Sequence, residues 1–279
     1  MKAALLLADA LVILVGLCIG SFLNVVIARV PRGESVVRPR SRCPGCRKPI
    51  AGYDNIPVVS WLILRGRCRN CRQPISPRYP LVEVVCAVLV FAVWKRYGPG
   101  GAFVGYAAFA CMLLALTFID LDTWLLPHQL TWPLLALGLL SPAWNPDVGW
   151  IDAAVGAGAG FSAFALVALV GEKLLKKETM GWGDVWLLAG IGAWLGWQAL
   201  LPVIVLSSLQ GALVGIALLA VHRPAADRPM PADLEDPGWV PPRHAVPFGP
   251  FLALGALEVL FLGDLIARWY FDVVGNFVR

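Results

Sequence analysis

Long apolar runs alternate with short polar segments along most of this chain. A helix needs about 20 apolar residues to cross the roughly 30 Å hydrocarbon core of a bilayer. Runs close to that length recur, and they predict eight transmembrane helices over residues 4–29, 80–97, 101–119, 129–145, 150–173, 182–199, 200–221 and 246–272. The pattern therefore predicts an all-α polytopic membrane protein, with a long polar loop after its first helix.

The composition agrees with this pattern, because 58% of the residues are hydrophobic and only 15% are charged. A water-soluble fold of this length could not bury so much apolar surface. The first apolar run resembles a signal peptide, but it is too long, has no basic start beyond Lys2, and contains Asp9 and Asn24. We expect it to be retained as a membrane helix.

Basic residues gather in the loop over residues 31–79, which holds 11 Lys and Arg against two acidic residues. The positive-inside rule predicts that this loop is cytoplasmic. Threading the helices from it also makes 120–128, 174–184 and 222–245 cytoplasmic. The 222–245 segment is rich in Pro, Ala and acidic residues, and we expect a flexible linker. Because aromatic residues are sparse in the basic loop, membrane lipid is the expected partner, not nucleic acid.

Four cysteines in this loop form two C-x-x-C motifs, Cys43/Cys46 and Cys68/Cys71, about twenty residues apart. This spacing is typical of a zinc ribbon, in which four thiolates close a tetrahedron and leave no open position. The predicted zinc is therefore structural. Two disulfides or four free thiols are the alternatives, and a reducing cytoplasm argues against disulfides. The other cysteines (Cys18, Cys86, Cys111) lie singly in apolar runs and are expected to be packing residues.

Two aspartates, Asp120 and Asp184, are brought to the same membrane face by the predicted topology, although they are far apart in sequence. Two neighbouring carboxyls that are partly buried would share one proton near neutral pH. One can then act as a base and the other as an acid on a hydrolytic water. The alternative is that Asp120 and Asp122 are interfacial charges and that Gly-Trp-Gly-Asp184 is a turn with a helix cap.

Other polar residues near the predicted helix ends have simpler explanations. Gly181 and Gly183 flank a turn before Asp184, where glycine permits positive φ and lets an extended peptide approach closely, so we expect them to position substrate. Glu83 is either a helix N-terminal charge or a substrate-binding residue. Interfacial placement or a structural hydrogen bond accounts for Asp152 and Asp264.

Several short motifs resemble, in the expected order, those of the prepilin leader peptidases with N-methyltransferase activity. They are Gly20-Ser-Phe-Leu-Asn24, Arg40-Ser-Arg-Cys43-Pro-Gly-Cys46, Tyr53-Asp-Asn-Ile-Pro57, Cys68-Arg-Asn-Cys71, Arg78-Tyr-Pro-Leu-Val-Glu83, Ile119-Asp120, Leu126-Pro127, Met180-Gly-Trp-Gly-Asp184 and Pro247-Phe-Gly-Pro250. The similarity extends along nearly the whole chain.

The resemblance implies an aspartic peptidase of the GxGD group with Asp120 and Asp184 as catalytic pair. Its substrates would be type IV prepilins or pseudopilins, cut after a glycine that follows a short basic leader. It also implies N-methylation of the new terminus with S-adenosylmethionine, through a region containing Asn24, Glu83 and the four cysteines. The implied domains are helix 1–30, zinc loop 31–79 and peptidase domain 80–279.

This chain departs from the family pattern at two positions. His128 replaces an Asp after Leu-Pro, and Trp186 replaces a Lys two residues after Asp184. His128 is expected to be a solvated loop residue or a pH-sensitive neighbour of Asp120. Two rival functions stay open: a peptidase without methylation, and a transporter or channel that uses its aspartates for cations or protons.

Overall fold

Helices form nearly all of the regular structure in the computed structural model, which describes residues 2–176, 180–220 and 246–277. The α-helices are α1 (Lys2–Arg29), α2 (Val59–Ile63), α3 (Arg78–Tyr97), α4 (Gly101–Thr123), α5 (His128–Leu140), α6 (Trp150–Leu175), α7 (Trp182–Leu195), α8 (Leu200–Ala220) and α9 (Gly249–Phe277). Within the described ranges no strand forms, and only two isolated β-bridges occur, in the cysteine loop. The all-α prediction is confirmed.

Each of the eight apolar segments predicted from the sequence contains an α-helix, and five helical segments are long and apolar enough to cross a membrane: Lys2–Arg32, Gly101–Thr123, Trp150–Leu175, Trp197–Ala220 and Gly249–Ile266. The helices α5 and α7 have 13 and 14 residues, about 20 Å at 1.5 Å per residue. The helix α3 is longer but contains Glu83, Lys95 and Arg96. That α3, α5 and α7 also cross the membrane stays a prediction.

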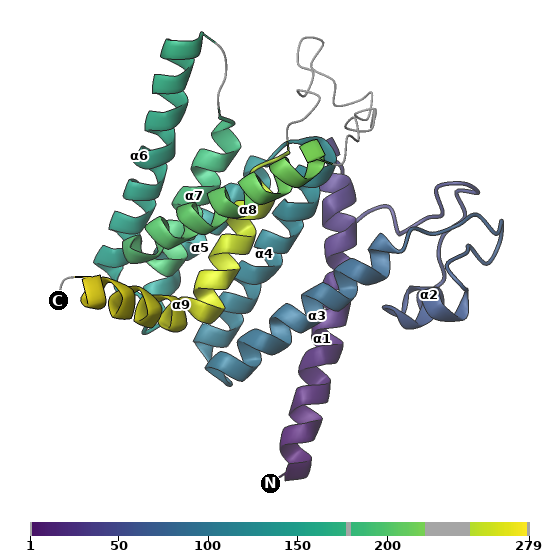
Figure 1. The fold of residues 1–279 in the computed structure, drawn as a ribbon. Coiled ribbons are helices and arrows are strands. Elements are labelled where there is room, and N and C mark those ends of the chain that lie inside the picture. Colours follow the sequence, from purple (N-terminus) through teal and green to yellow (C-terminus); the bar gives the residue numbers. More distant parts are fainter. Residues whose placement is uncertain (1, 177–179, 221–245, 278–279) are drawn as a thin grey trace. The chain divides into compact units, whose positions relative to one another are not determined.

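The fold divides into two compact units, and residues 1–115 form the first. In this unit α1 packs against α3 (Figure 1). Glycine makes this packing possible, because a Cβ on Gly16 would lie 2.7 Å from the Cα of Ala87, and one on Gly20 would lie 2.6 Å from the Cα of Glu83. Asp9 joins the two helices by accepting a hydrogen bond from the Trp94 indole at 2.9 Å.

Two of the cysteines predicted to lie singly form a buried pair in the same unit. The Sγ atoms of Cys86 on α3 and Cys111 on α4 are 3.7 Å apart. Both are free thiols. Their role as packing residues stays a prediction, but they pack against each other.

The second unit covers residues 116–279 and has the short helix α7 in its interior. Most of α7 is buried, from Val185 to Trp194, and α6 runs beside it (Figure 1). Gly156 on α6 and Gly192 on α7 bring the two backbones into contact. The Trp194 indole donates a hydrogen bond to the Leu134 carbonyl of α5 at 2.8 Å. Neighbouring helices thus cover α7 on several sides, although it is too short to span a bilayer unaided.

Polar side chains join α8 to α9 within this second unit. The Ser207 hydroxyl donates to the Phe251 carbonyl at 3.0 Å, and the Gln210 amide donates to Glu258 at 2.6 Å. Interhelical hydrogen bonds of this kind hold apolar helices in register. They fix the beginning of α9, which supplies part of the candidate site. The predicted 222–245 linker lies outside the described residues, as do positions 177–179 of the 174–184 connection.

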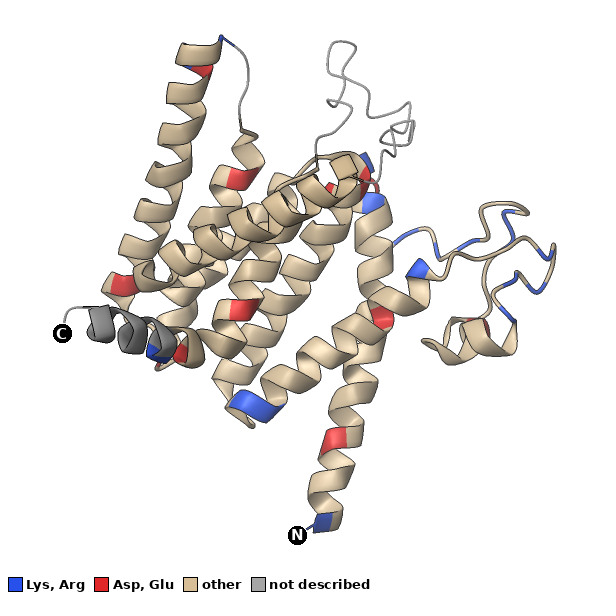
Figure 2. Ribbon diagram, in the orientation of Figure 1, with Lys and Arg blue, Asp and Glu red and all other residues tan. Residues whose placement is uncertain are grey.

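Charged side chains are distributed unevenly along the chain. Lys and Arg gather on the connection between α1 and α3, whereas the helices are mostly uncharged (Figure 2). Such a distribution is expected for helices that face lipid and a loop that faces water.

Candidate functional site

Asp120 lies in the last turn of α4, and only 5% of its surface is exposed. The backbone N–H of Gly249, the first residue of α9, donates a hydrogen bond to its Oδ2 atom at 3.0 Å. One carboxylate oxygen is therefore held by the backbone of a segment far away in sequence. That hydrogen bond fixes the direction in which the Asp120 carboxyl points.

Asp184 lies in the first turn of α7, and Gly181 is the N-cap residue of that helix. The N–H of Asp184 donates to the Gly181 carbonyl at 3.1 Å, which closes this turn. The Asp184 side chain is turned inward, and its buried Oδ1 atom has no hydrogen-bond partner among the described residues. A buried carboxylate oxygen without a partner is costly, and in native proteins it commonly marks a place where water or a ligand binds.

The structure brings Asp120 and Asp184 close enough for their charges to interact. Leu126, in the connection between α4 and α5, fills the space beside them. A Cβ on Gly183 would lie 2.7 Å from the Leu126 Cβ, and one on Gly249 would lie 3.3 Å from the Leu126 Cδ1. The end of α4, the start of α7 and the start of α9 thus converge on one pair of acids.

The two glycines before Asp184 do not adopt the positive φ that glycine permits. Gly181 has a φ of −69°, and Gly183 is an ordinary helical residue of α7. Close approach explains Gly183 instead, because a side chain there would collide with Leu126. That either glycine positions substrate stays a prediction.

Gly249 belongs to the site, although it is not among the site residues predicted above. A Cβ at this position would lie 2.5 Å from the Asp120 Oδ2 atom, so a side chain would displace the carboxyl. The available signal was the motif Pro247-Phe-Gly-Pro250, in which a glycine stands between prolines at the beginning of an apolar run. Its contact with Asp120 is visible only in three dimensions.

The two residues that depart from the family pattern lie beside each other. His128 is exposed, begins α5 and stacks on Trp132, with ring centroids 5.3 Å apart. Its ring also meets that of Trp186 edge-on at 6.5 Å. Trp186 in turn packs against Phe161 at 5.0 Å. An aromatic cluster therefore occupies this part of the second unit.

Asn24 and Glu83, the two residues expected to bind the methyl donor, have structural partners in the first unit. The Asn24 amide donates a hydrogen bond to the Tyr79 carbonyl in the first turn of α3, at 3.1 Å. Glu83 lies one turn further along the same helix. The Glu83 carboxylate accepts the Val58 N–H at 2.7 Å. Val58 has a φ of 61°, a strained value for a β-branched residue, so this bond stabilises an unfavourable turn.

The four cysteines Cys43, Cys46, Cys68 and Cys71 converge, with their Sγ atoms all within 4.8 Å of one another. The Sγ atoms of Cys43 and Cys71 are 3.6 Å apart. Four thiolates about 2.3 Å from one zinc ion would lie about 3.8 Å apart, so the sulfur positions fit a tetrahedral metal centre. The cluster can therefore hold a metal ion.

The two C-x-x-C segments have the same backbone conformation, although the sequence analysis did not identify them as a repeat. The N–H of Cys43 bonds to the Lys48 carbonyl, and the N–H of Cys68 bonds to the Gln73 carbonyl in the same way. Arg47 and Arg72, which follow the second cysteine of each segment, both have positive φ, at 56° and 61°. The repeated string Arg-Cys-x-x-Cys-Arg-x-Pro-Ile, at 42–50 and 67–75, was the signal.

Backbone amides favour the thiolate form in the second segment. The N–H groups of Cys71 and Asn70 lower the pKa of the Cys68 thiol to about 6. Thiolates are the form that binds metal, so the turn itself prepares this sulfur for coordination.

Comparisons with known proteins agree with the motifs. Residues 14–97 match the family described as the bacterial peptidase A24 N-terminal domain, and residues 107–216 match the type IV leader peptidase family. A prepilin leader peptidase/N-methyltransferase of Aeromonas hydrophila is 43% identical over 94% of this chain and 93% of its own length. Its namesake in Myxococcus xanthus is 40% identical over 91% and 90%. No solved structure matches this chain significantly.

Proposed function

Because this chain belongs to the type IV leader peptidase family, we propose that it removes the leader from prepilin or pseudopilin precursors and then N-methylates the new amino terminus. Relatives that match it over most of their length have the combined name of peptidase and N-methyltransferase. The five apolar helices identify a multi-pass membrane protein, and the relatives suggest the bacterial inner membrane.

The observation that best supports the peptidase activity is the meeting of Asp120 with Asp184, two acids from different helices of the second unit. One carboxyl is fixed by the Gly249 N–H, and the other has a buried oxygen without a partner in the described part of the chain. A water molecule between two such acids can be activated without a metal or a nucleophilic side chain. We therefore assign the catalytic roles to this pair.

In this mechanism the two carboxyls share one proton before the reaction begins. The ionised carboxylate removes a proton from the water as the water oxygen attacks the carbonyl carbon of the scissile bond. The protonated carboxyl donates its proton to the developing oxyanion. When the tetrahedral intermediate collapses, the carbon–nitrogen bond breaks, the departing amine takes a proton from one carboxyl, and a hydroxyl of the intermediate returns its proton to the other, so the pair again holds one proton. Gly249 keeps one carboxyl in place throughout, which limits the reorganisation that the reaction requires.

The proposed substrate segment has a short basic leader followed by a glycine, and the cut falls after that glycine. We place the cysteine loop and both aspartates on the cytoplasmic side, where basic loops are retained. The supporting fact is the excess of 11 basic over two acidic residues in positions 31–79.

Zinc is the metal that we propose for the four cysteines. Four thiolates satisfy its preferred tetrahedral coordination and leave no position for substrate, so the ion would hold the two C-x-x-C turns together. The methyl donor would be S-adenosylmethionine, and we place methyl transfer in the region of residues 1–79. The Asn24 and Glu83 side chains already form hydrogen bonds within the fold. That they also bind the methyl donor stays a prediction.

The proposed function is tested with purified full-length protein, a leader-bearing precursor peptide and methyl-labelled S-adenosylmethionine. We expect cleavage after the leader glycine, followed by label on the new terminal amine. A precursor with leucine in place of that glycine serves as the control and should stay uncut and unlabelled. Cleavage without label would reduce the function to that of a peptidase alone. A precursor that is never cut, with or without the donor, would refute the proposal.

A further inference from the structure

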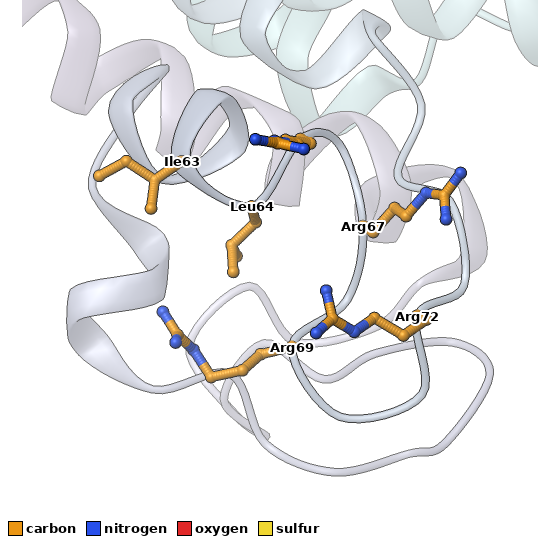
Figure 3. A pocket seen from close by; sticks show the side chains of 6 residues that line it. Ile63, Leu64, Arg67, Arg69 and Arg72 are labelled. Atoms are coloured by element: carbon orange, nitrogen blue, oxygen red, sulfur yellow. The ribbon is translucent and has the colours of Figure 1, made fainter.

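A cavity of about 570 Å³ opens in the loop of the first unit, and nothing in the proposed function uses it. Its volume falls within the range of about 300–1,000 Å³ that is typical of small-ligand sites. Figure 3 shows the side chains that surround it, which are Ile63, Leu64, Arg65, Arg67, Arg69 and Arg72. Four guanidinium groups and two aliphatic side chains thus share one space.

Most of the arginines around this cavity have no carboxylate partner among the described residues. Arg69 is paired with Asp54, whose Oδ1 atom lies 2.6 Å from its Nη2 atom. The guanidinium groups of Arg65, Arg67 and Arg72 have no ion pair or hydrogen bond with any described residue. Arginines held close together repel one another, and an anion that accepts their hydrogen bonds removes that repulsion. Arginine also matches the oxygen geometry of phosphate better than lysine does.

The backbone holds these arginines in place. Arg67 takes part in the β-bridge to Pro74, and Arg72 follows Cys71 in the left-handed conformation. Arg65 has positive φ as well, at 53°. The positive-inside rule explains why the loop is basic, but it does not explain why four of its 11 basic residues line one cavity. The fold thus brings four arginines to the rim of one space.

Apolar side chains near the cavity indicate what kind of molecule would carry the bound anionic group. Ile63, which lines the cavity, is 71% exposed, and Leu62, the residue before it in α2, is 60% exposed. Exposed aliphatic residues next to guanidinium groups are typical of protein surfaces that lie in the headgroup region of a bilayer. The loop also begins directly after a helix long enough to span the membrane, Lys2–Arg32. A free phosphate ion would use the arginines but would leave these aliphatic side chains in water.

We propose that this cavity binds the phosphate group of an anionic membrane lipid, with the lipid's apolar part against Leu62 and Ile63. The arginines supply charge-assisted hydrogen bonds to the phosphate oxygens, and the apolar residues favour a lipid over a soluble phosphate. The proposal is independent of the peptidase and methyltransferase activities. It requires only that the loop lies at a membrane surface.

The repeated C-x-x-C segments offer a matched control. Arg42 and Arg47 occupy the same positions in the first segment as Arg67 and Arg72 in the second, but they do not line this cavity. The variants Arg67→Gln/Arg72→Gln and Arg42→Gln/Arg47→Gln therefore remove equal charge at equivalent sequence positions beside the cysteines. The variant Arg67→Lys/Arg72→Lys keeps the charge, and Leu62→Ser/Ile63→Ser tests the apolar contact. Bound metal and the melting temperature of each variant show whether it is folded.

The experiment titrates full-length protein in neutral detergent with fluorescent phosphatidylglycerol and, separately, with fluorescent phosphatidylcholine. We expect the wild type to prefer phosphatidylglycerol about tenfold, and Arg67→Gln/Arg72→Gln to lose most of that preference. The first-segment control should stay within about twofold of the wild type, and the lysine variant should fall between. Equal binding of both lipids, or equal loss in both glutamine variants, would overturn the proposal. If inorganic phosphate displaces the lipid at low millimolar concentration and Leu62→Ser/Ile63→Ser binds normally, the ligand is free phosphate and the lipid assignment is wrong.

Discussion

His128 and Trp186 meet edge-on in the second unit, with ring centroids 6.5 Å apart and ring planes at 85°. They are the two positions at which the chain departs from the pattern Leu-Pro-Asp and Gly-x-Gly-Asp-x-Lys. Because both departures fall in one contact, they are best understood together. An aromatic pair here replaces what would be an acidic and a basic side chain in the usual pattern.

This interpretation predicts that the Asp and the Lys of the family pattern are tolerated in this chain only when both are introduced together. His128→Asp and Trp186→Lys should each destabilise the protein, because each leaves a charged group beside an aromatic ring. The double variant should recover stability, with a coupling free energy of about 1 kcal/mol between the two changes. Equilibrium unfolding in mixed micelles measures it. The control pairs His128→Asp with Trp197→Lys, a tryptophan outside the cluster, and should be additive. Additivity in the test pair as well would contradict the interpretation.

The helices could be predicted because long apolar runs leave few alternatives in a membrane protein. Their ends were harder to place. The predicted segment 182–199 stops as an α-helix at Leu195, because Gly196 takes a φ of 80°. The segment 129–145 stops at Leu140, before the turn at Ser141-Pro142. Local backbone geometry sets the ends of both helices, and the hydrophobic pattern of the sequence does not reveal that geometry.

The candidate site was predictable in its acids and its cysteines but not in its supporting residues. Asp120 and Asp184 are unusual at helix ends in an apolar chain, so composition draws attention to them. Nothing in the sequence distinguishes Gly249 from the other glycines, of which the chain has 28 in all. Its importance comes from its close contact with Asp120, a residue remote from it in the sequence. The contact between Glu83 and Val58 depends likewise on a turn whose strained φ has no sequence signature.

Gly249→Ala should impair cleavage although no reacting group is removed. The added methyl group would lie 2.5 Å from the Asp120 Oδ2 atom, so the carboxyl must turn away from its present direction. A displacement of about 1 Å can reduce turnover about 10²-fold. Rates of precursor cleavage measure this effect. Gly263→Ala on the same helix meets only the Val259 side chain, at 3.7 Å, and should cleave normally. Normal rates in both variants would show that the Gly249 contact is dispensable.

Glu83 can be assigned to structure or to chemistry by comparing two substitutions. Glu83→Gln keeps an oxygen that accepts the Val58 N–H, whereas Glu83→Ala leaves that N–H without its partner. An unpaired buried donor costs about 1–3 kcal/mol. If the residue is structural, the alanine variant should unfold at lower temperature while the glutamine variant stays near the wild type in stability and in methyl transfer. Loss of methyl transfer in a stable glutamine variant would show instead that the charge itself is required.

Zinc content should follow the four clustered cysteines and no others. Cys46→Ser and Cys71→Ser each remove one of the four sulfurs, so zinc measured by elemental analysis should fall from about one ion per chain to near zero. Cys18→Ser, on the exposed side of α1, should retain the metal. A wild-type protein purified without zinc, or a serine variant that keeps a full complement, would show that these sulfurs do not form the proposed centre.

The central claim is that Asp120 and Asp184 together activate the hydrolytic water. Single-turnover cleavage of a leader-bearing precursor by Asp120→Asn, Asp184→Asn and Asp122→Asn tests it most directly, since Asp122 is an exposed acid in the same last turn of α4. We predict that the first two variants and their combination are all slower by about 10³-fold or more, because members of a cooperating pair fail together, while Asp122→Asn cleaves at nearly the wild-type rate. Cleavage that persists at the wild-type rate in either Asp120→Asn or Asp184→Asn would contradict the mechanism.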